Sequence, residues 1–238
     1  MDLGLRGRVV LVVGGAGYIG REIARTFVEE GAVVVIGGRT PEKLEVAEAE
    51  VGAAGTVVVD TRDAASARSA VDQVLAAHGR LDVLVNTAAP SAGTLDPARD
   101  HDAEQVLDAI DGKAMGYLRM TEAAVPVMRA AGFGRIIQIS GQNAWLSGSV
   151  TAAARNAVVN TSAKAIADEL AGSGVTVNVV NPGNVTDAPS AEVALGRGGE
   201  SSPSQIAALV AFLASDAAAA VSGESIAVGH RVRGIQFG

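Results

Sequence analysis

Short apolar runs alternate with longer segments of mixed apolar and charged residues along the chain. This alternation is typical of βαβ units, in which parallel strands are joined by helices that cover the sheet. We expect strands at residues 8–13, 32–36, 56–59, 81–85, 135–139, 175–180 and 225–228. We expect helices at residues 19–30, 41–51, 64–77, 102–131, 151–171 and 203–215. The pattern predicts an α/β fold: one domain over 1–238, with a doubly wound, Rossmann-like parallel sheet of about seven strands and helices on both faces.

Two stretches of this pattern are irregular. Pro126 lies inside the long helical segment 102–131, where a proline is expected to kink the helix. Residues 183–202 carry Gly, Ser, Pro and Asn without periodicity and follow the sixth strand. Because loops at the carboxyl ends of parallel strands form the ligand crevice, we predict that 183–202 is a lid over the substrate. The alternative is a surface loop without a role in binding.

Composition narrows the possible chemistry. The chain has no cysteine, which excludes disulfides, thiolate zinc sites, iron–sulfur clusters and a cysteine nucleophile, and we expect no metal. There are 26 acidic and 19 basic residues, and the net charge of −7 argues against a nucleic-acid or anionic-membrane partner. No apolar run approaches the length of a membrane helix, and no basic leader precedes one. We therefore expect a cytoplasmic protein with a small-molecule substrate or ligand.

A glycine-rich turn follows the first expected strand. Residues 15–20 read Gly-Ala-Gly-Tyr-Ile-Gly, the G-x-G-x-x-G pattern, and they open the next helix. In this context glycines let the backbone approach a pyrophosphate, and the helix amino terminus stabilises the anion. The alternative is a turn that only packs helix against strand. The candidate cofactor-binding residues here are Gly14, Gly15, Gly17, Tyr18, Ile19 and Gly20.

The end of the second strand bears on the choice of dinucleotide. NAD-specific folds of this kind usually place an acidic residue there, which binds the ribose 2′-hydroxyl. This chain has Gly-Gly at 37–38, followed by Arg39 and Thr40. A guanidinium at this point suits a 2′-phosphate, so the sequence favours NADP(H) over NAD(H). The alternative is that Arg39 is a solvated loop charge.

Three further segments complete a family pattern. They are Asp60 with Thr61 after the third strand, Asn-Thr-Ala-Ala at 86–89 after the fourth, and Asn-Pro-Gly-Asn-Val-Thr at 181–186 after the sixth. With the glycine turn, they make the chain resemble the short-chain dehydrogenase/reductase family over nearly its whole length. The resemblance implies that Asp60 and Thr61 meet the adenine, and that Asn86 and Ala88 stabilise the sheet and line the cofactor. It also implies that a last group of residues lies near the nicotinamide carboxamide and the pyrophosphate: Pro182, Gly183, Val185 and Thr186.

The family's acid is missing from this chain. Related enzymes use a Ser that orients the carbonyl, a Tyr that transfers the proton, and a Lys four residues after the Tyr. Tyr18 and Tyr117 are the only tyrosines, and neither is followed by Lys at that spacing. Alignment on the neighbouring motifs puts Ala152 at the family Tyr position and Asn156 at the Lys position.

One substitution suggests compensation. Lys113 falls where the family has an Asn, so Asn and Lys have changed places between positions 113 and 156. An ammonium that reaches the same cavity from the other helix can still meet the ribose or polarise a water. The alternative is that Lys113 is a solvated helix residue. Our candidate catalytic residues are Ser140, Lys113 and Asn156, while Tyr117 is expected to pack rather than to replace the lost phenol.

These features are compatible with three hypotheses about function. The one we favour is an NADP-dependent oxidoreductase that acts on a carbonyl or alcohol with a non-standard proton relay. The alternatives are a non-redox enzyme, such as a cyclase or isomerase, that reuses the pocket, and a catalytically silent protein that senses NADP(H). The resemblance also implies a homotetramer or homodimer, formed through the helices at 102–131 and 151–171.

Overall fold

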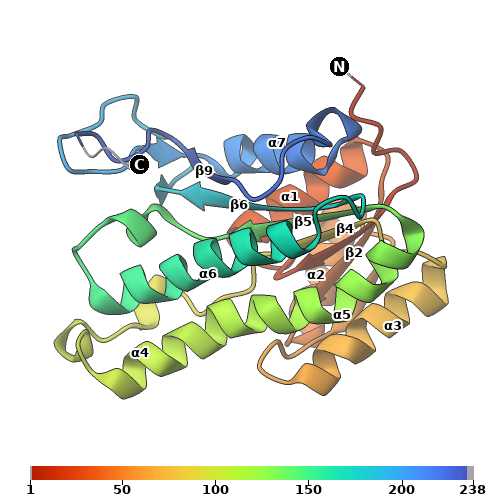
Figure 1. Cartoon of the computed structure of the whole chain (residues 1–238), viewed down its shortest axis with the longest axis horizontal. Helices are drawn as coiled ribbons and strands as arrows, with labels where there is room; N and C mark the ends of the chain where they lie inside the picture. The colour runs from red at the N-terminus through yellow and green to blue at the C-terminus, as the bar shows by residue number, and fades with distance from the viewer. Residues whose placement is uncertain (1, 235–238) are drawn as a thin grey trace.

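The computed structural model describes residues 2–234, and within them seven parallel strands form one central sheet (Figure 1). The strand order is β3-β2-β1-β4-β5-β6-β9. The strands are β1 (Val9–Val13), β2 (Val33–Gly38), β3 (Gly55–Val58), β4 (Val83–Asn86), β5 (Gly134–Ile139), β6 (Val175–Pro182) and β9 (Ser225–Val228). The chain runs outward from β1 to β3 and then crosses back to β4. The order therefore reverses between β1 and β4, the point where such sheets bind ligands.

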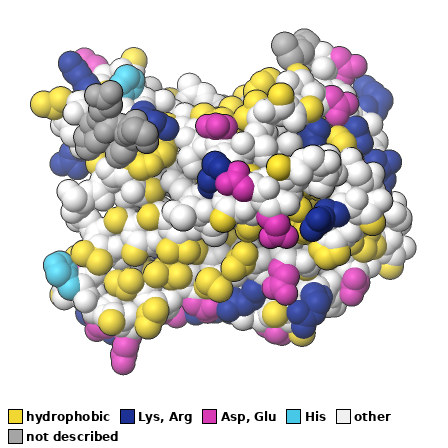
Figure 2. Space-filling model, in the orientation of Figure 1, with side chains coloured by type: hydrophobic (Ala, Val, Ile, Leu, Met, Phe, Trp, Pro, Cys, Tyr) yellow, Lys and Arg dark blue, Asp and Glu magenta, His cyan; other side chains and the backbone are white. Residues whose placement is uncertain are grey.

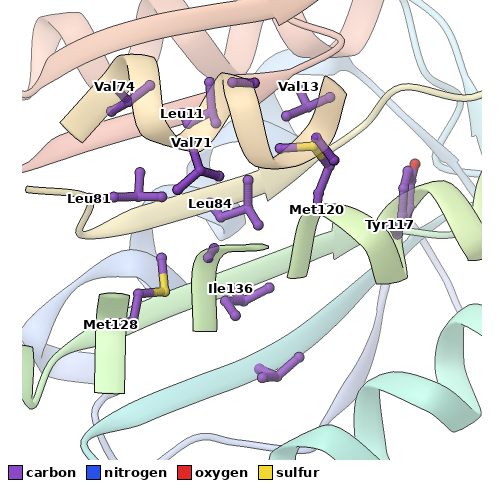
Figure 3. Packing of buried hydrophobic residues seen from close by; sticks show 14 of the residues in the cluster. Leu11, Val13, Val71, Val74, Leu81, Leu84, Tyr117, Met120, Met128 and Ile136 are labelled. Carbon is purple, nitrogen blue, oxygen red and sulfur yellow. The ribbon is translucent and has the colours of Figure 1, made fainter. Parts of the chain in front are cut away.

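Helices cover both faces of the sheet, as the sequence predicted. One face carries α3 (Ala64–His78), α5 (Gly116–Ala131) and α6 (Val150–Glu169), and the other carries α1 (Tyr18–Glu29), α2 (Pro41–Val51) and α7 (Pro203–Ala214). Each layer has its own aliphatic core. Figure 3 shows the first core, where Leu11 and Leu84 of the sheet pack against Val71 of α3 and Met120 of α5. Because β1 is buried on both faces, its sequence is a continuous apolar run rather than an alternating one.

The long helical segment is interrupted at a point that no sequence signal marks. Instead of one helix at 102–131, the structure has α4 (Ala103–Ile110), a π-helical turn at Asp111–Met115, and then α5. Pro126 lies inside α5 on an exposed position, where water can satisfy the backbone group that a proline leaves unpaired. π-Helical turns often occur at functional sites, and this turn carries Lys113.

The segment 183–202 is more regular than its composition indicates. Its two ends form short parallel strands, β7 (Asn184–Val185) and β8 (Glu200–Ser201). Strands of two residues leave no periodic signal in a sequence. No helix in the described part of the chain combines the length and apolar character needed to cross a bilayer.

Candidate cofactor and active site

A cleft of about 670 Å³ opens at the carboxyl ends of β1, β2 and β4, where the strand order reverses. Its walls include nine of the residues that the sequence singled out: Gly14, Gly17, Tyr18, Ile19, Arg39, Thr40, Asp60, Thr61 and Ala88. These residues come from four separate segments of the chain. The structure thus brings the glycine turn, the end of β2, the end of β3 and the segment after β4 to one place.

The glycine turn has little room for side chains. Gly14 has φ +90°, and a Cβ atom there would lie 2.6 Å from the backbone nitrogen of Ala88. A Cβ atom at Gly20 would lie 2.2 Å from the carbonyl oxygen of Gly14. Gly17 is the N-cap of α1 and offers no capping side chain, so an anion can approach the amino terminus of the helix directly. The turn therefore fits the pyrophosphate of a dinucleotide, while Gly15 and Gly20 serve its packing.

Two cations line the cleft beyond β2. Arg39 follows the strand, and Lys43 lies in the first turn of α2. Neither side chain forms an ion pair with any residue from 2 to 234. The sequence analysis missed Lys43, although a basic residue four positions after Arg39 is a signal that could have indicated it. Two unpaired cations at this wall favour an anionic group on the ribose side of the ligand.

The opposite wall is formed by residues 60–62. The Asp60 carboxylate accepts a hydrogen bond from the backbone nitrogen of Arg62 at 3.0 Å. Arg62 lines the cleft, but its guanidinium forms ion pairs with Asp108 at 2.7 Å and Asp111 at 3.1 Å. The sequence analysis did not identify Arg62, and nothing in its spacing indicates these partners. Because its charge is already neutralised, Arg62 acts as a wall of the cleft rather than as a free cation.

The remaining cofactor candidates lie outside the cleft wall. Asn86 is fully buried at the end of β4, and neither its amide nitrogen nor its amide oxygen has a hydrogen-bond partner among the described residues. Pro182 ends β6 inside the core, while Gly183, Val185 and Thr186 begin the 183–202 segment. Tyr18 donates a hydrogen bond to Asp187, which ties this segment to the glycine turn. The lining of the cleft thus fits the adenosine and pyrophosphate half of a dinucleotide.

The three candidate catalytic residues meet behind this cleft. Lys113 Nζ donates to Asn156 Oδ1 at 2.7 Å and to the Ser140 carbonyl oxygen at 3.0 Å. Ser140 Oγ lies 3.1 Å from the Asn156 carbonyl oxygen and 3.4 Å from Asn156 Oδ1. Gly112, the neighbour of Lys113, lines the cleft. The side chains at positions 113 and 156 therefore share one buried polar cluster, so Lys113 is not a solvated helix residue.

The electrostatics of this cluster are unusual. Burial and, to a smaller extent, the nearby positive charge of Arg155 together lower the pKa of Lys113 to about 7. Arg155 is itself only 5% exposed and donates to the Pro90 carbonyl oxygen at 3.1 Å. No ion pair with an acidic residue is formed by Lys113 or Arg155 within residues 2–234. An amine of this kind changes protonation near neutral pH, as a general acid or base requires.

No phenol lies in the position that the family uses. Ala152 occupies the buried face of α6 one turn before Asn156, and its carbonyl oxygen accepts from Asn156 Nδ2 at 2.9 Å. Tyr117 is buried in the core, and its hydroxyl donates to the Ile139 carbonyl oxygen at 3.0 Å. Burial raises the pKa of Tyr117. A phenol that holds its proton this firmly is a poor acid. Tyr117 is therefore a packing residue rather than a replacement for the family's phenol.

Comparisons with known proteins agree with this architecture. The family model described as short chain dehydrogenase matches residues 8–194. The (2S)-[(R)-hydroxy(phenyl)methyl]succinyl-CoA dehydrogenase subunit BbsC of Thauera aromatica is 33% identical, and the match covers 93% of both chains. The 3-oxoacyl-[acyl-carrier-protein] reductase FabG of Thermotoga maritima is 32% identical over 94% of this chain and 97% of its own. A short chain dehydrogenase from Bacillus anthracis superposes with a TM-score of 0.84 at 31% identity, covering 94% of this chain and 96% of that one.

The doubly wound sheet and the cleft at its switch point define a dinucleotide-binding α/β protein. The full-length matches make the class more specific: the chain belongs to the short-chain dehydrogenase/reductase family, whose members are oxidoreductases that bind a nicotinamide cofactor. This confirms the resemblance and the fold class predicted from the sequence.

Proposed function

We propose that this protein is an NADP(H)-dependent oxidoreductase acting on a carbonyl or alcohol, in which Lys113, Asn156 and Ser140 replace the family's Tyr-x-x-x-Lys. The observation that carries the proposal is the buried contact between Lys113 Nζ and Asn156 Oδ1 at 2.7 Å. It puts an amine that titrates near neutral pH into the cluster that also contains Ser140. The similarity to a dehydrogenase subunit and to a reductase of the same family supports the reaction class.

The preference for NADP(H) is supported by the wall beyond β2. Arg39 and Lys43 line the cleft without acidic partners among the described residues. No acidic side chain follows Arg39 before α2 begins. A 2′-phosphate there would gain charge-assisted hydrogen bonds, whereas a bare 2′-hydroxyl would leave both cations unused.

In the relay, each residue has a separate task. Ser140 Oγ orients the substrate oxygen, and Asn156 Oδ1 holds Lys113 Nζ in place. A protonated Lys113 has three N–H donors, of which two bind Ser140 and Asn156. The third is available to a water or to the substrate oxygen, so it can deliver the proton that reduction of a carbonyl consumes. The nicotinamide cofactor, when bound, supplies the hydride.

We also propose that the protein assembles as a homodimer or homotetramer through α4 and α6. These two helices lie side by side, and Figure 2 shows hydrophobic side chains gathered over this face. Leu107 of α4 is 66% exposed, and Val150 and Val158 of α6 are also exposed. Exposed apolar side chains grouped on one face indicate an interaction surface.

The test combines binding with turnover. Isothermal titration of the wild-type protein with NADPH and NADH should show tighter binding of NADPH. Arg39→Ala should weaken NADPH binding by roughly tenfold or more and leave NADH binding nearly unchanged, since a charge-assisted hydrogen bond is lost only for the phosphate. Arg129→Ala, an exposed cation on the last turn of α5, is the matched control. NADPH oxidation is then followed with a panel of ketones and aldehydes.

Each result bears on a different part of the proposal. If neither dinucleotide binds, the cofactor site is wrong. If both bind equally and Arg39→Ala changes neither, the NADP(H) preference is wrong. If NADPH binds but is never oxidised by the panel, the silent NADP(H)-binding protein becomes the better explanation.

A further inference from the structure

An ion-pair network joins the adenosine side of the cleft to the π-helical turn at Asp111–Met115. The Asp111 carboxylate accepts from Arg62 Nη1 at 3.1 Å and from Arg119 Nη2 at 2.7 Å. Arg119 Nη1 also donates to the backbone carbonyl oxygen of Thr61 at 3.2 Å. Thr61 and Arg62 line the cleft. Asp111 is therefore held between the cleft wall and α5.

The backbone of the turn also packs tightly against this wall. A Cβ atom at Gly112 would lie 2.7 Å from Arg62 Nη2 and 2.9 Å from Pro90 Cγ. A Cβ atom at Gly116 would lie 2.8 Å from Thr61 Oγ1. Gly112 in the turn and Gly116 directly after it are thus the points of close approach to Arg62 and Thr61. A shift of residues 61–62 would therefore be transmitted directly to the turn.

The position of Lys113 depends on this turn. A π-helical turn spans one residue more per hydrogen bond than an α-helical turn, and it is rare, occurring mostly as a single turn inside an α-helix. Lys113 is the central residue of the turn, and from there it reaches Ser140, directly after β5, and Asn156 on α6. The groups around its amine are Ser140, Asn156 and the nearby cation Arg155 of α6. Because none of these is acidic, no charge attraction inside the cluster holds the amine.

We propose that Asp111, clamped by Arg62 and Arg119, is a positioning residue that fixes the π-helical turn and thereby places Lys113 Nζ beside Ser140 and Asn156. Occupation of the wall formed by Thr61 and Arg62 by the adenosine half of a dinucleotide tightens this placement. The role of Lys113 in turnover rests on the proposed function, but the placement of its amine by Asp111 does not.

Amine labelling tests the placement without any turnover. The chain has only three lysines, so mass spectrometry resolves the labelling rate of Lys113 from that of exposed Lys164. Asp111→Asn removes two partly exposed ion pairs. It should raise the labelling rate of Lys113 relative to Lys164, taken from the alkaline plateau where the amine is unprotonated in both proteins, by about fivefold, as expected for pairs of this exposure. Asp108→Asn is the matched control, since it removes the other partner of Arg62 and leaves Asp111 in place.

Two further readouts separate positioning from general loosening. Asp111→Glu should restore slow labelling, and the pH dependence of labelling should show the apparent pKa of Lys113 moving upward in Asp111→Asn as the amine reaches water. ADP-ribose, which lacks the nicotinamide, should slow the labelling of Lys113 in the wild type and in Asp108→Asn, but not in Asp111→Asn. If circular dichroism shows that Asp111→Asn is unfolded, Arg119→Gln replaces it.

The outcomes are distinct. Unchanged Lys113 labelling in folded Asp111→Asn, or equal effects of Asp111→Asn and Asp108→Asn, would overturn the positioning role of Asp111. Lack of any effect of ADP-ribose would overturn its link to the cleft wall. If labelling changes as expected while NADPH turnover does not, the clamp stands and the proposed catalytic role of Lys113 fails.

Discussion

Lys113 makes the stability of this protein depend on pH in a direction that the structure determines. Its amine is 6% exposed, and burial together with the Arg155 charge lowers its pKa to about 7, whereas the ordinary value is 10.5. Between these two values the unfolded chain binds a proton that the folded protein does not. Stability must therefore rise with pH through this window and be lowest below pH ~7, where both states are protonated.

The magnitude follows from the two pKa values. A pKa of about 7 in place of 10.5 means that protonation costs the folded protein about 5 kcal/mol more than the unfolded chain. Integration over part of the window gives a gain in unfolding free energy of about 2 kcal/mol between pH ~7 and pH ~9. Lys113→Met removes the titrating group, so this gain should vanish. The variant also leaves Asn156 Oδ1 and the Ser140 carbonyl without their donor, which lowers stability by a roughly constant amount at every pH.

The assay is urea unfolding of wild type and Lys113→Met at several pH values from about 6 to 10, read by the fluorescence of Trp145. Other groups titrate in both proteins, so the difference between the two curves isolates Lys113. Lys164→Met, which removes an exposed lysine, should run parallel to the wild type. Parallel curves for wild type and Lys113→Met would refute the reasoning, because they would mean that Lys113 titrates as an ordinary lysine.

Two further predictions follow from the packing and the surface. Gly20→Ala should lower the melting temperature and weaken dinucleotide binding, because its Cβ would lie 2.2 Å from the Gly14 carbonyl oxygen. Overpacking of this kind typically costs about 1–3 kcal/mol. Gly148→Ala, where no atom lies within 4 Å of the added Cβ, should be neutral in the same thermal melt and titration. Leu107→Glu should shift the molar mass measured by light scattering toward that of the monomer. Val46→Glu, the matched change at an exposed position of α2, should leave the molar mass unchanged. An unchanged mass for Leu107→Glu would contradict assembly through α4 and α6.

Much of the fold could be predicted from the sequence because the signals were local. The helix at Pro41–Val51 and the strand at Ser225–Val228 have the bounds that proline placement and apolar runs indicated. The π-helical turn could not be predicted, since nothing in the spacing of the residues indicates that Asp111 pairs with Arg62, 49 residues before it in the chain, and with Arg119 of α5. The strands β7 and β8 pair only two residues each and have no periodicity to detect.

The candidate site likewise has features that could be predicted from the sequence and features that could not. The glycine turn, Arg39 and Asp60 belong to segments whose type and position in a βαβ unit indicate a dinucleotide, and the structure gathers them in one cleft. The exchange of residue types predicts that the Lys113 amine reaches the cavity of position 156, and in the structure it donates to Asn156 Oδ1. The burial of Arg155 and its effect on the pKa of Lys113 could not be predicted, because they depend on how α6 packs against the Pro90 segment.

The role of Lys113 as proton donor can be measured through the pH dependence of kcat/KM for NADPH-driven carbonyl reduction. If protonated Lys113 delivers the proton, kcat/KM should fall as pH rises above about 7, following the pKa of its amine. Lys113→Met should lose roughly 10²–10⁴-fold in kcat/KM and show no such fall, as expected when a positioned acid is removed, while NADPH binding is retained. A Lys113→Met protein with the wild-type rate and the wild-type pH profile would contradict the account.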